Sequence, residues 1–515
     1  MVSDRRSWWG LGAAVALFLT AGTAMGREPL SAIDWLSDSV DLPERSATAI
    51  QDEPRASLPS TIVVAPLDRP VADSVGLLDP GTYGLSREIW GRSAAADLAR
   101  AVTSLPDTGR APPSIGRFVR DLLVMRLSPP VDAMGDESLF LARVDRLLTM
   151  GHLGDAAELI EAAGADDPRR FRRAFDIALL TGTETEACRV IERSPEISPT
   201  YPARIFCLAR NGSWDIAALT LGNAEALGIL DDAEDQLLLH FLDPELFESE
   251  PLPAPPRNPS PLTFRLFEAV GERLPTEPLP LAFAMADLTD TVGWRSRLRA
   301  AERLAAARAI PVERLLSVYL ERKPAASGGV WERVSAVQGL VSDLDTDDGE
   351  GMLAETLPPA WSAARDAGYA AELARWLAPR LEDFDLDGAA AHVAFEIALL
   401  AGRVDTARRF ASGTREDRFL LALASGQSGA APPSDDLGRA IVRGLSAPGA
   451  GARYQPYLDD GRPGEALLRA LSALMEGAAG NPDATTDALA LLRALGLGAL
   501  AQQVAVELVL TEGAA

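Results

Sequence analysis

The chain is poor in cysteine, histidine and lysine. Its 515 residues include two cysteines, Cys188 and Cys207, one lysine, and three histidines, His152, His240 and His392. The histidines are far apart, so none of them forms a pair with metal-ligand spacing. We find no phosphate-binding glycine loop, nucleophile elbow or zinc motif. The sequence therefore predicts no catalytic residue, although a site assembled from distant residues stays open.

Positive charge is also scarce. The chain has 49 Lys and Arg residues against 74 Asp and Glu residues, which gives a formal net charge of −25. A strongly anionic surface repels the phosphates of nucleic acids and of anionic membranes. The composition therefore argues against nucleic acid as a partner. At 515 residues, the chain is too long for a single core, and we expect two or three packed units.

The first 26 residues have the build of a bacterial secretory signal. Arg5 and Arg6 precede an apolar run over residues 8–19, and Ala24 and Gly26 supply the small residues of a cleavage site. We expect export through this cleavable signal peptide and a periplasmic mature protein. An uncleaved inner-membrane anchor is the alternative, if the apolar helix continues past the cleavage site.

One short pattern recurs along the chain, in which an apolar helical stretch ends in glycine and alanine follows five residues later. The six copies are Gly151 to Ala156, Gly182 to Ala187, Gly212 to Ala217, Gly402 to Ala407, Gly461 to Ala466 and Gly496 to Ala501. Glycine accepts the left-handed conformation that closes a helix, and alanine lets the next helix approach closely. Phe171, Phe175 and Leu179 recur at helical spacing between copies. One hairpin cannot bury such a stripe alone, so the pattern predicts an all-α fold, an α-solenoid of stacked helical hairpins.

The run Gly151-His-Leu-Gly-Asp-Ala156 between two amphipathic helices resembles the central turn of tetratricopeptide-like (TPR/SEL1-type) repeats. The resemblance implies a scaffold that binds peptides or partner proteins. It covers about half of the chain and lacks the aromatic signature of the first helix, so no binding residue is carried over. A related superhelix is found in soluble lytic transglycosylases. Their Glu-Ser pair and downstream Gly-Leu-Met-Gln-like run are not matched, because Glu137-Ser138 lacks the second part.

Proline-rich stretches divide the chain. We expect a signal peptide over 1–26, an extended Pro-rich N-terminal arm with short helices over 27–113, a first helical-repeat segment over 114–250, a Pro-rich linker over 251–261, a second helical segment over 262–427 and C-terminal helical repeats over 428–515. In the arm, Ile33, Trp35 and Leu36 form an apolar cluster. The arm is either a flexible tether or a segment that docks through this cluster on a partner or on the solenoid.

Cys188 and Cys207 are placed to form a disulfide. Cys188 lies at the start of one predicted helix and Cys207 inside the next, and their midpoint falls in the turn over residues 194–199. Residues equidistant from the turn of an antiparallel pair face each other, and an oxidising compartment favours the bond. The alternative is a pair of small core residues.

One acidic run matches half of a metal-binding loop. Asp383, Asp385 and Asp387 precede Gly388 as in the first half of an EF-hand calcium loop, but Ala394 occupies the position of the closing glutamate. These three aspartates are the calcium candidates. The alternative is that Asp387 caps the helix that begins near Gly388. No other cofactor is expected.

Together these features predict a non-catalytic periplasmic scaffold or adaptor that binds a protein or peptide partner in the bacterial envelope. The alternative is a peptidoglycan- or polysaccharide-processing accessory protein, or an enzyme with an unrecognised site. The composition of the binding surface distinguishes the two. Exposed aromatic rings, for example Tyr201 or Trp214, favour a glycan, whereas arginines and apolar pockets favour a peptide or protein.

Overall fold

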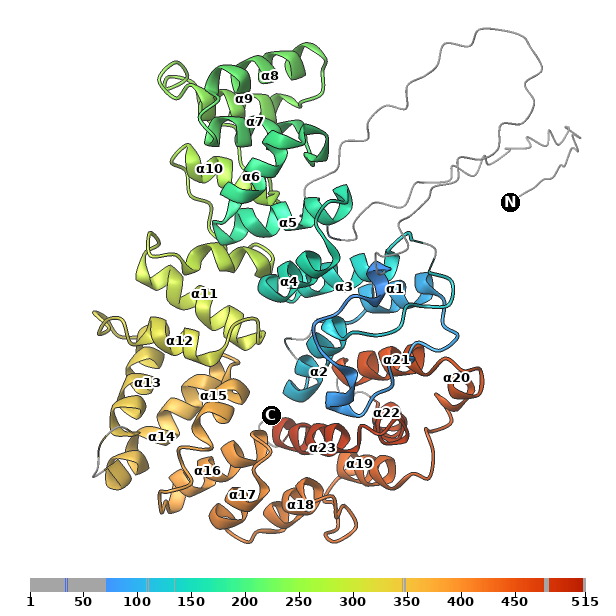
Figure 1. The fold of residues 1–515 in the computed structure, drawn as a ribbon. Helices are drawn as coiled ribbons and strands as arrows, with labels where there is room; N and C mark the ends of the chain where they lie inside the picture. The colour runs from blue at the N-terminus through green and yellow to red at the C-terminus, as the bar shows by residue number, and fades with distance from the viewer. Residues whose placement is uncertain are drawn as a thin grey trace, which may run out of the picture. The chain divides into compact units, whose positions relative to one another are not determined.

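The computed structural model describes Ile33, Trp35 and residues 71–107, 109, 111–133, 135–344, 346, 349–476 and 481–512. In this part of the chain the regular elements are helices, and the only β pairing is an isolated bridge between Leu78 and Met125. The fold is therefore all-α, as the sequence predicts (Figure 1). The described residues belong to one compact unit, Ser31–Ala515. The predicted signal peptide and the predicted arm up to residue 70, apart from Ile33 and Trp35, lie outside them.

The N-terminal elements are arranged around helix α3. They are η1 (Ala72–Ser74), η2 (Pro80–Tyr83), α1 (Ala95–Thr103), α2 (Pro113–Val124), α3 (Ser138–Thr149) and α4 (Leu153–Ala163). Helices α1, α2 and α4 and the short η1 all pack on α3. Residues 71–113, which the sequence places in the extended arm, bury Trp90, Leu98 and Val102. These apolar side chains form part of the same hydrophobic core as α3.

Arg143 of α3 anchors this N-terminal segment through backbone groups. Its buried guanidinium donates to the carbonyl oxygens of Leu123 at 2.7 Å, Val75 at 2.9 Å and Met125 at 2.9 Å. Burial lowers the pKa of Arg143 to about 10, so the side chain stays charged at neutral pH. The carbonyl oxygens satisfy donors that would otherwise be costly to bury.

The next elements leave α3 and later return to it. They are α5 (Pro168–Thr181), α6 (Glu184–Arg193), η4 (Pro195–Ile197), α7 (Tyr201–Arg210), α8 (Trp214–Ala226), α9 (Asp232–Leu242), α10 (Pro261–Ala269) and η5 (Leu281–Leu288). From α3 to α10 each α-helix packs on the next one, and α10 and η5 both return to α5. The Pro-rich stretch 251–260 connects α9 to α10 without helix.

The remaining helices continue the array and bring the C-terminus back to the start of the fold (Figure 1). They are α11 (Trp294–Ala306), α12 (Val312–Tyr319), α13 (Val330–Leu344), α14 (Gly349–Asp366), α15 (Ala370–Leu377), α16 (Gly388–Leu400), α17 (Val404–Phe410), α18 (Arg415–Ala424), α19 (Asp436–Ser446), α20 (Gln455–Asp459), α21 (Pro463–Met475), α22 (Pro482–Ala494) and α23 (Gly498–Glu512). Helix α21 packs on α1 and α2, and α23 packs on α2, α16 and α18.

The turn glycines behave as the sequence pattern predicts. All six, from Gly151 to Gly496, have φ between 70° and 86°. Five of the paired alanines are fully buried, and Ala187 is partly buried. The turn between α11 and α12 reaches the same conformation without glycine, because Arg308 has φ of 64°. Its guanidinium lies against Gly116 of α2, where a Cβ atom would come within 2.5 Å of Nη2.

A buried carboxylate joins the last helix to the second. Glu507 of α23 accepts hydrogen bonds from the backbone N–H of Ser114 at 2.9 Å and from its hydroxyl at 2.7 Å. Ser114 lies in the first turn of α2, whose N-cap, Pro112, has no side chain that can accept a hydrogen bond. Arg117 donates to Glu372 of α15 at 2.9 Å and lies 3.7 Å from Glu507. Three helices that are distant in sequence therefore meet at the N-terminus of α2.

Cys188 and Cys207 form a disulfide between α6 and α7, as predicted. Their sequence separation is 19 residues, and both side chains are buried. We expect reduction to lower the free energy of unfolding by about 3 kcal/mol, because the open chain regains loop entropy. Denaturant unfolding with and without reductant measures this. Two reactive thiols in the unfolded, unreduced protein would contradict the pairing.

A second prediction concerns pH. Burial raises the pKa of the Glu507 carboxyl, so the folded chain keeps this proton at pH values where the unfolded chain has released it. The free energy of unfolding should therefore fall as pH rises from the unfolded pKa to the folded one. This component of the slope should be absent in Glu507→Gln. Urea unfolding of both proteins between about pH 4 and pH 7 measures it. The control is Glu158→Gln, since Glu158 is exposed; parallel curves for all three proteins would refute the expectation.

Candidate functional site

Helices α6 to α9 form a branch between two helices that contact each other. Helix α10 packs on both α9 and α5, so the chain leaves the rest of the fold after α5 and returns beside it (Figure 1). The main contacts of α7 are with α6, α8 and α9, and those of α8 are with α7 and α9. Helix α8 is therefore covered from one side only.

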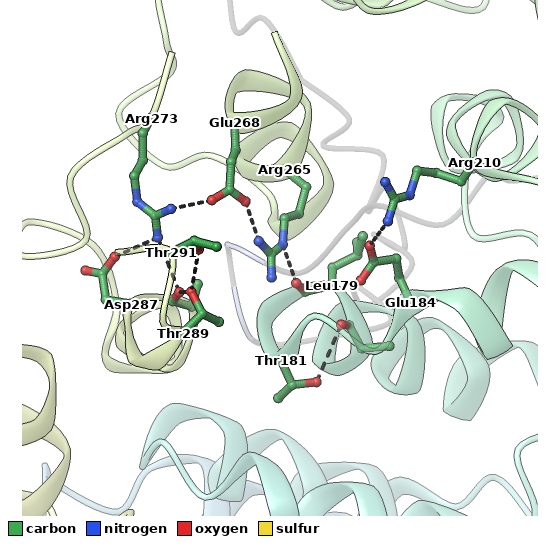
Figure 2. A network of polar contacts seen from close by, with 12 residues as sticks. Leu179, Thr181, Glu184, Arg210, Arg265, Glu268, Arg273, Asp287, Thr289 and Thr291 are labelled. Atoms are coloured by element: carbon green, nitrogen blue, oxygen red, sulfur yellow. Dashed lines mark hydrogen bonds and ion pairs between the residues drawn. The ribbon is translucent and has the colours of Figure 1, made fainter. Parts of the chain in front are cut away.

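Figure 2 shows the polar contacts at the base of this branch. Arg265 of α10 donates through Nε to the carbonyl oxygen of Leu179, 2.5 Å away in the last turn of α5. A cation at this end of a helix is favourable, because the last carbonyl groups carry partial negative charge. Glu268 pairs with both Arg265 and Arg273, and Arg273 reaches Asp287 of η5 at 2.9 Å. The returning segment is thereby fixed to the helix from which the branch departs.

Two further links join α6 to α7 inside the branch. Arg210 at the end of α7 pairs with Glu184 at the start of α6 at 2.9 Å (Figure 2). The Cys188–Cys207 disulfide joins the same two helices. Helix α8 thus packs on α7, which is itself cross-linked to α6.

Helix α8 has apolar residues on two sides. Its buried side carries Ala217, Leu221 and Ala224. Ile216, Leu219 and Leu227 follow one another at i, i+3 and i+11, a spacing that places them on a second side of the helix. Leu219 is 66% exposed and Leu227 is 70% exposed. We call Ile216, Leu219 and Leu227 the α8 stripe.

Exposed apolar side chains are concentrated around this stripe. Eleven large hydrophobic residues are exposed in the described part of the chain, and six of them lie between residues 214 and 246. These six are Trp214, Ile216, Leu219, Leu227, Ile229 and Leu246. Single exposed hydrophobic residues are ordinary, whereas a cluster marks an interaction surface. The α8 stripe is therefore our candidate functional site.

Acidic side chains border the stripe at its C-terminal end. Glu225, Asp232 and Asp235 come from the end of α8 and the start of α9. Burial raises the pKa of Asp235, and the negative charges of Glu225 and Asp232 raise it further. The buried Oδ1 atom of Asp235 has no hydrogen-bond partner. We call these three residues the acidic trio.

The aromatic residues near the stripe are only partly accessible. Trp214 is 47% exposed, and its ring lies 5.9 Å from that of Phe241, tilted by 42°. Tyr201, the other ring proposed from the sequence for a glycan, is half-buried at the start of α7. Of the six large hydrophobic side chains exposed between residues 214 and 246, five are aliphatic.

The calcium candidates do not converge on a common point. In the part of the chain that the structure describes, no group of three or more His, Cys, Asp or Glu side chains is arranged to hold a metal ion. Asp383, Asp385 and Asp387 are all described, so the loop that contains them does not gather their carboxylates. Asp387 is the N-cap residue of α16, but its side chain makes no capping hydrogen bond.

The apolar cluster of the arm is described in part. Trp35 is buried, and its ring contacts that of Phe283 in η5 edge-to-face, with centroids 5.5 Å apart. Ile33 packs against the same core, and Leu36 lies outside the described residues. The sequence left open whether this cluster docks on a partner or on the chain's own helices. The contacts of Trp35 and Ile33 are with the chain's own core.

A cavity of about 830 Å³ lies where α3, α11 and the turn after α14 meet. Its wall includes Arg299, Glu277 and Glu302. Arg299 pairs with Glu277 at 3.1 Å, and Glu302 accepts hydrogen bonds from Tyr319 at 2.6 Å and from Arg333 at 2.8 Å. These two carboxylates are engaged by cations, so they do not form the free pair that acid–base catalysis of glycoside hydrolysis needs.

Sequence reasoning did not identify the α8 stripe. Its signal is present, because α8 carries large apolar residues all round rather than on one face. From its sequence alone, a helix that is apolar all round is predicted to be fully buried. Only its neighbours in the fold show which side stays exposed.

No helix among the described residues has the length and apolar character needed to cross a bilayer.

Comparisons of the chain with protein-family models, with curated proteins and with solved structures find no match.

Proposed function

We propose that this chain is a non-catalytic helical-repeat adaptor of the bacterial envelope that binds a protein partner on the α8 stripe. In this proposal the helical hairpins form a TPR-like α-solenoid, and the predicted signal peptide over residues 1–26 directs the chain to the periplasm.

The solenoid part of the proposal is supported by the turns and by the order of packing. Each turn glycine of the repeat pattern has positive φ, and five of the six paired alanines are fully buried. The helices from α3 to α9 pack in sequence order. Elements that contact only near neighbours along the chain are typical of repeat architectures.

The observation that carries the binding proposal is the clustering of exposed aliphatic side chains on the branch. Burying a leucine or isoleucine side chain contributes about 1.5–3 kcal/mol. The three residues of the stripe are partly buried already, so they offer on the order of 4 kcal/mol, from which ordering costs are subtracted. With further contacts from neighbouring groups, this free energy is enough for a protein complex of moderate affinity.

A protein partner is favoured over a glycan by the kind of side chain exposed. Sugar rings stack on flat, accessible aromatic faces. Here the large exposed groups of α8 are aliphatic, apart from Trp214, which is tilted against Phe241. The aliphatic side chains of the α8 stripe can pack against the apolar face of another polypeptide.

We predict that a photo-crosslinking amino acid at Leu219 forms a discrete protein adduct in intact cells. The matched control is the same substitution at Met352 of α14, which is also exposed, at 50%. Gel electrophoresis after muramidase digestion separates protein adducts from glycan adducts. A glycan adduct alone at Leu219, or equal labelling from both positions, would refute the proposal.

A further inference from the structure

We infer that the partner segment that binds the α8 stripe is cationic and amphipathic, with an apolar face flanked by Lys or Arg. This inference rests on the proposed function, because it names the chemistry of the partner for the same surface. It comes from the charge of the branch, whereas the proposed function comes from its exposed apolar side chains.

The chain from the start of the α7–α8 turn to the Pro-rich stretch before α10 contains no lysine or arginine. Residues 211–256 hold neither, although an average of 49 such residues in 515 would place about four in a stretch of this length. The same stretch holds ten acidic residues, Asp215, Glu225, Asp231, Asp232, Glu234, Asp235, Asp243, Glu245, Glu248 and Glu250. The acids of this stretch therefore find no Lys or Arg partner within it.

Two basic groups near the acids, Arg210 and His240, are engaged elsewhere. Arg210, directly before the stretch, pairs with Glu184. The single histidine of the stretch, His240, is buried, and its ring nitrogens lie 2.8 Å and 3.1 Å from the carbonyl oxygens of Gln236 and Glu250. Neither side chain is directed at the acids beside the stripe.

Acids stand at both ends of the stripe. Asp215 precedes Ile216 on α8, and Glu225 of the acidic trio lies two residues before Leu227. At the C-terminal end of the stripe, the negative charges of Glu225 and Asp232 act on Asp235. One buried oxygen of Asp235, Oδ1, has no hydrogen-bond donor. A Lys or Arg side chain reaching this end would supply both a donor and a counter-charge. The apolar stripe and the acids can thus be satisfied by one amphipathic segment.

Other occupants fit the surface less well. A second copy of the chain would bring two acidic branches together, which like-charge repulsion opposes. An anionic membrane or a nucleic acid meets the same repulsion. A neutral apolar segment would cover the stripe and leave the trio further desolvated, which is costly without a partner. A cationic amphipathic segment avoids each of these costs.

The test uses two synthetic peptides and the full chain. Both peptides are 18-residue helices with leucine at i, i+3, i+4 and i+7; one carries Lys and Arg on its other face, and its matched counterpart carries Glu there. Fluorescence anisotropy measures their binding. We expect the cationic peptide to bind, with affinity that falls as salt rises, and the acidic peptide to show no binding.

Charge variants locate the attraction on the chain. Glu225→Gln, Asp232→Asn and Asp235→Asn together should weaken binding of the cationic peptide on the order of tenfold, because three favourable charge contacts are lost. The matched control makes the same change in net charge on other helices. It combines Asp405→Asn, Asp436→Asn and Asp483→Asn, whose side chains are 95%, 85% and 95% exposed. We expect this control to stay within about twofold of the unaltered chain.

A third variant, Leu219→Ser, separates this inference from the proposed function. Leu219 is exposed, so the change should leave the far-ultraviolet circular dichroism intact while weakening peptide binding. If both peptides bind equally and Leu219→Ser weakens both, the adaptor proposal stands and the charge inference fails. If the control triple weakens binding as much as the trio variant does, attraction to the net charge explains it and the inference fails.

Two further outcomes bear on both ideas. If Leu219→Ser changes nothing, the stripe is not the docking surface and the proposed function fails at this site. If neither peptide binds and the chain instead dimerises through the stripe, as judged by loss of the dimer in Leu219→Ser, a second copy is the occupant and the inference is overturned.

Discussion

The contact between Glu507 and the N-terminus of α2 is the constraint on which the arrangement of the helices depends. It joins residues 393 positions apart in the sequence, with Arg117 bridging to Glu372 on a third helix. A carboxylate buried this deeply is tolerated because the N–H and hydroxyl of Ser114 donate to it. An open array of hairpins would leave its first and last helices with uncovered apolar faces. Here the last helix, α23, packs on α2, and α21 packs on both α1 and α2.

The branch, helices α6 to α9, takes no part in the packing of the C-terminal helices on the N-terminal ones. Helix α10 returns to α5, and Arg265 fixes the return by binding the end of that helix. The helices between them therefore pack on one another and leave one side of α8 open. Its exposed leucines are a consequence of the chain's path, and the acids around them set which partner the surface suits. The proposed adaptor function thus follows from packing rather than from reactive groups.

Several features could be predicted from the sequence because nearby residues decide them. The turn glycines and buried alanines are separated by five positions, and the two cysteines by 19. The Asp383 to Asp387 run shows the limit of such reasoning. Its spacing matches half of a calcium loop, but spacing does not make carboxylates converge when the segment leads directly into helix α16.

The sequence by itself determined that the chain is helical, where its hairpins turn and which cysteines pair, because backbone preference and local apolar spacing act over a few tens of residues. Only the tertiary structure decided that α23 covers α2, that Arg308 takes a left-handed turn against Gly116, and that α8 keeps one apolar side exposed. These outcomes depend on which helices meet across hundreds of residues, and a buried and an exposed leucine read alike until the neighbours are in place.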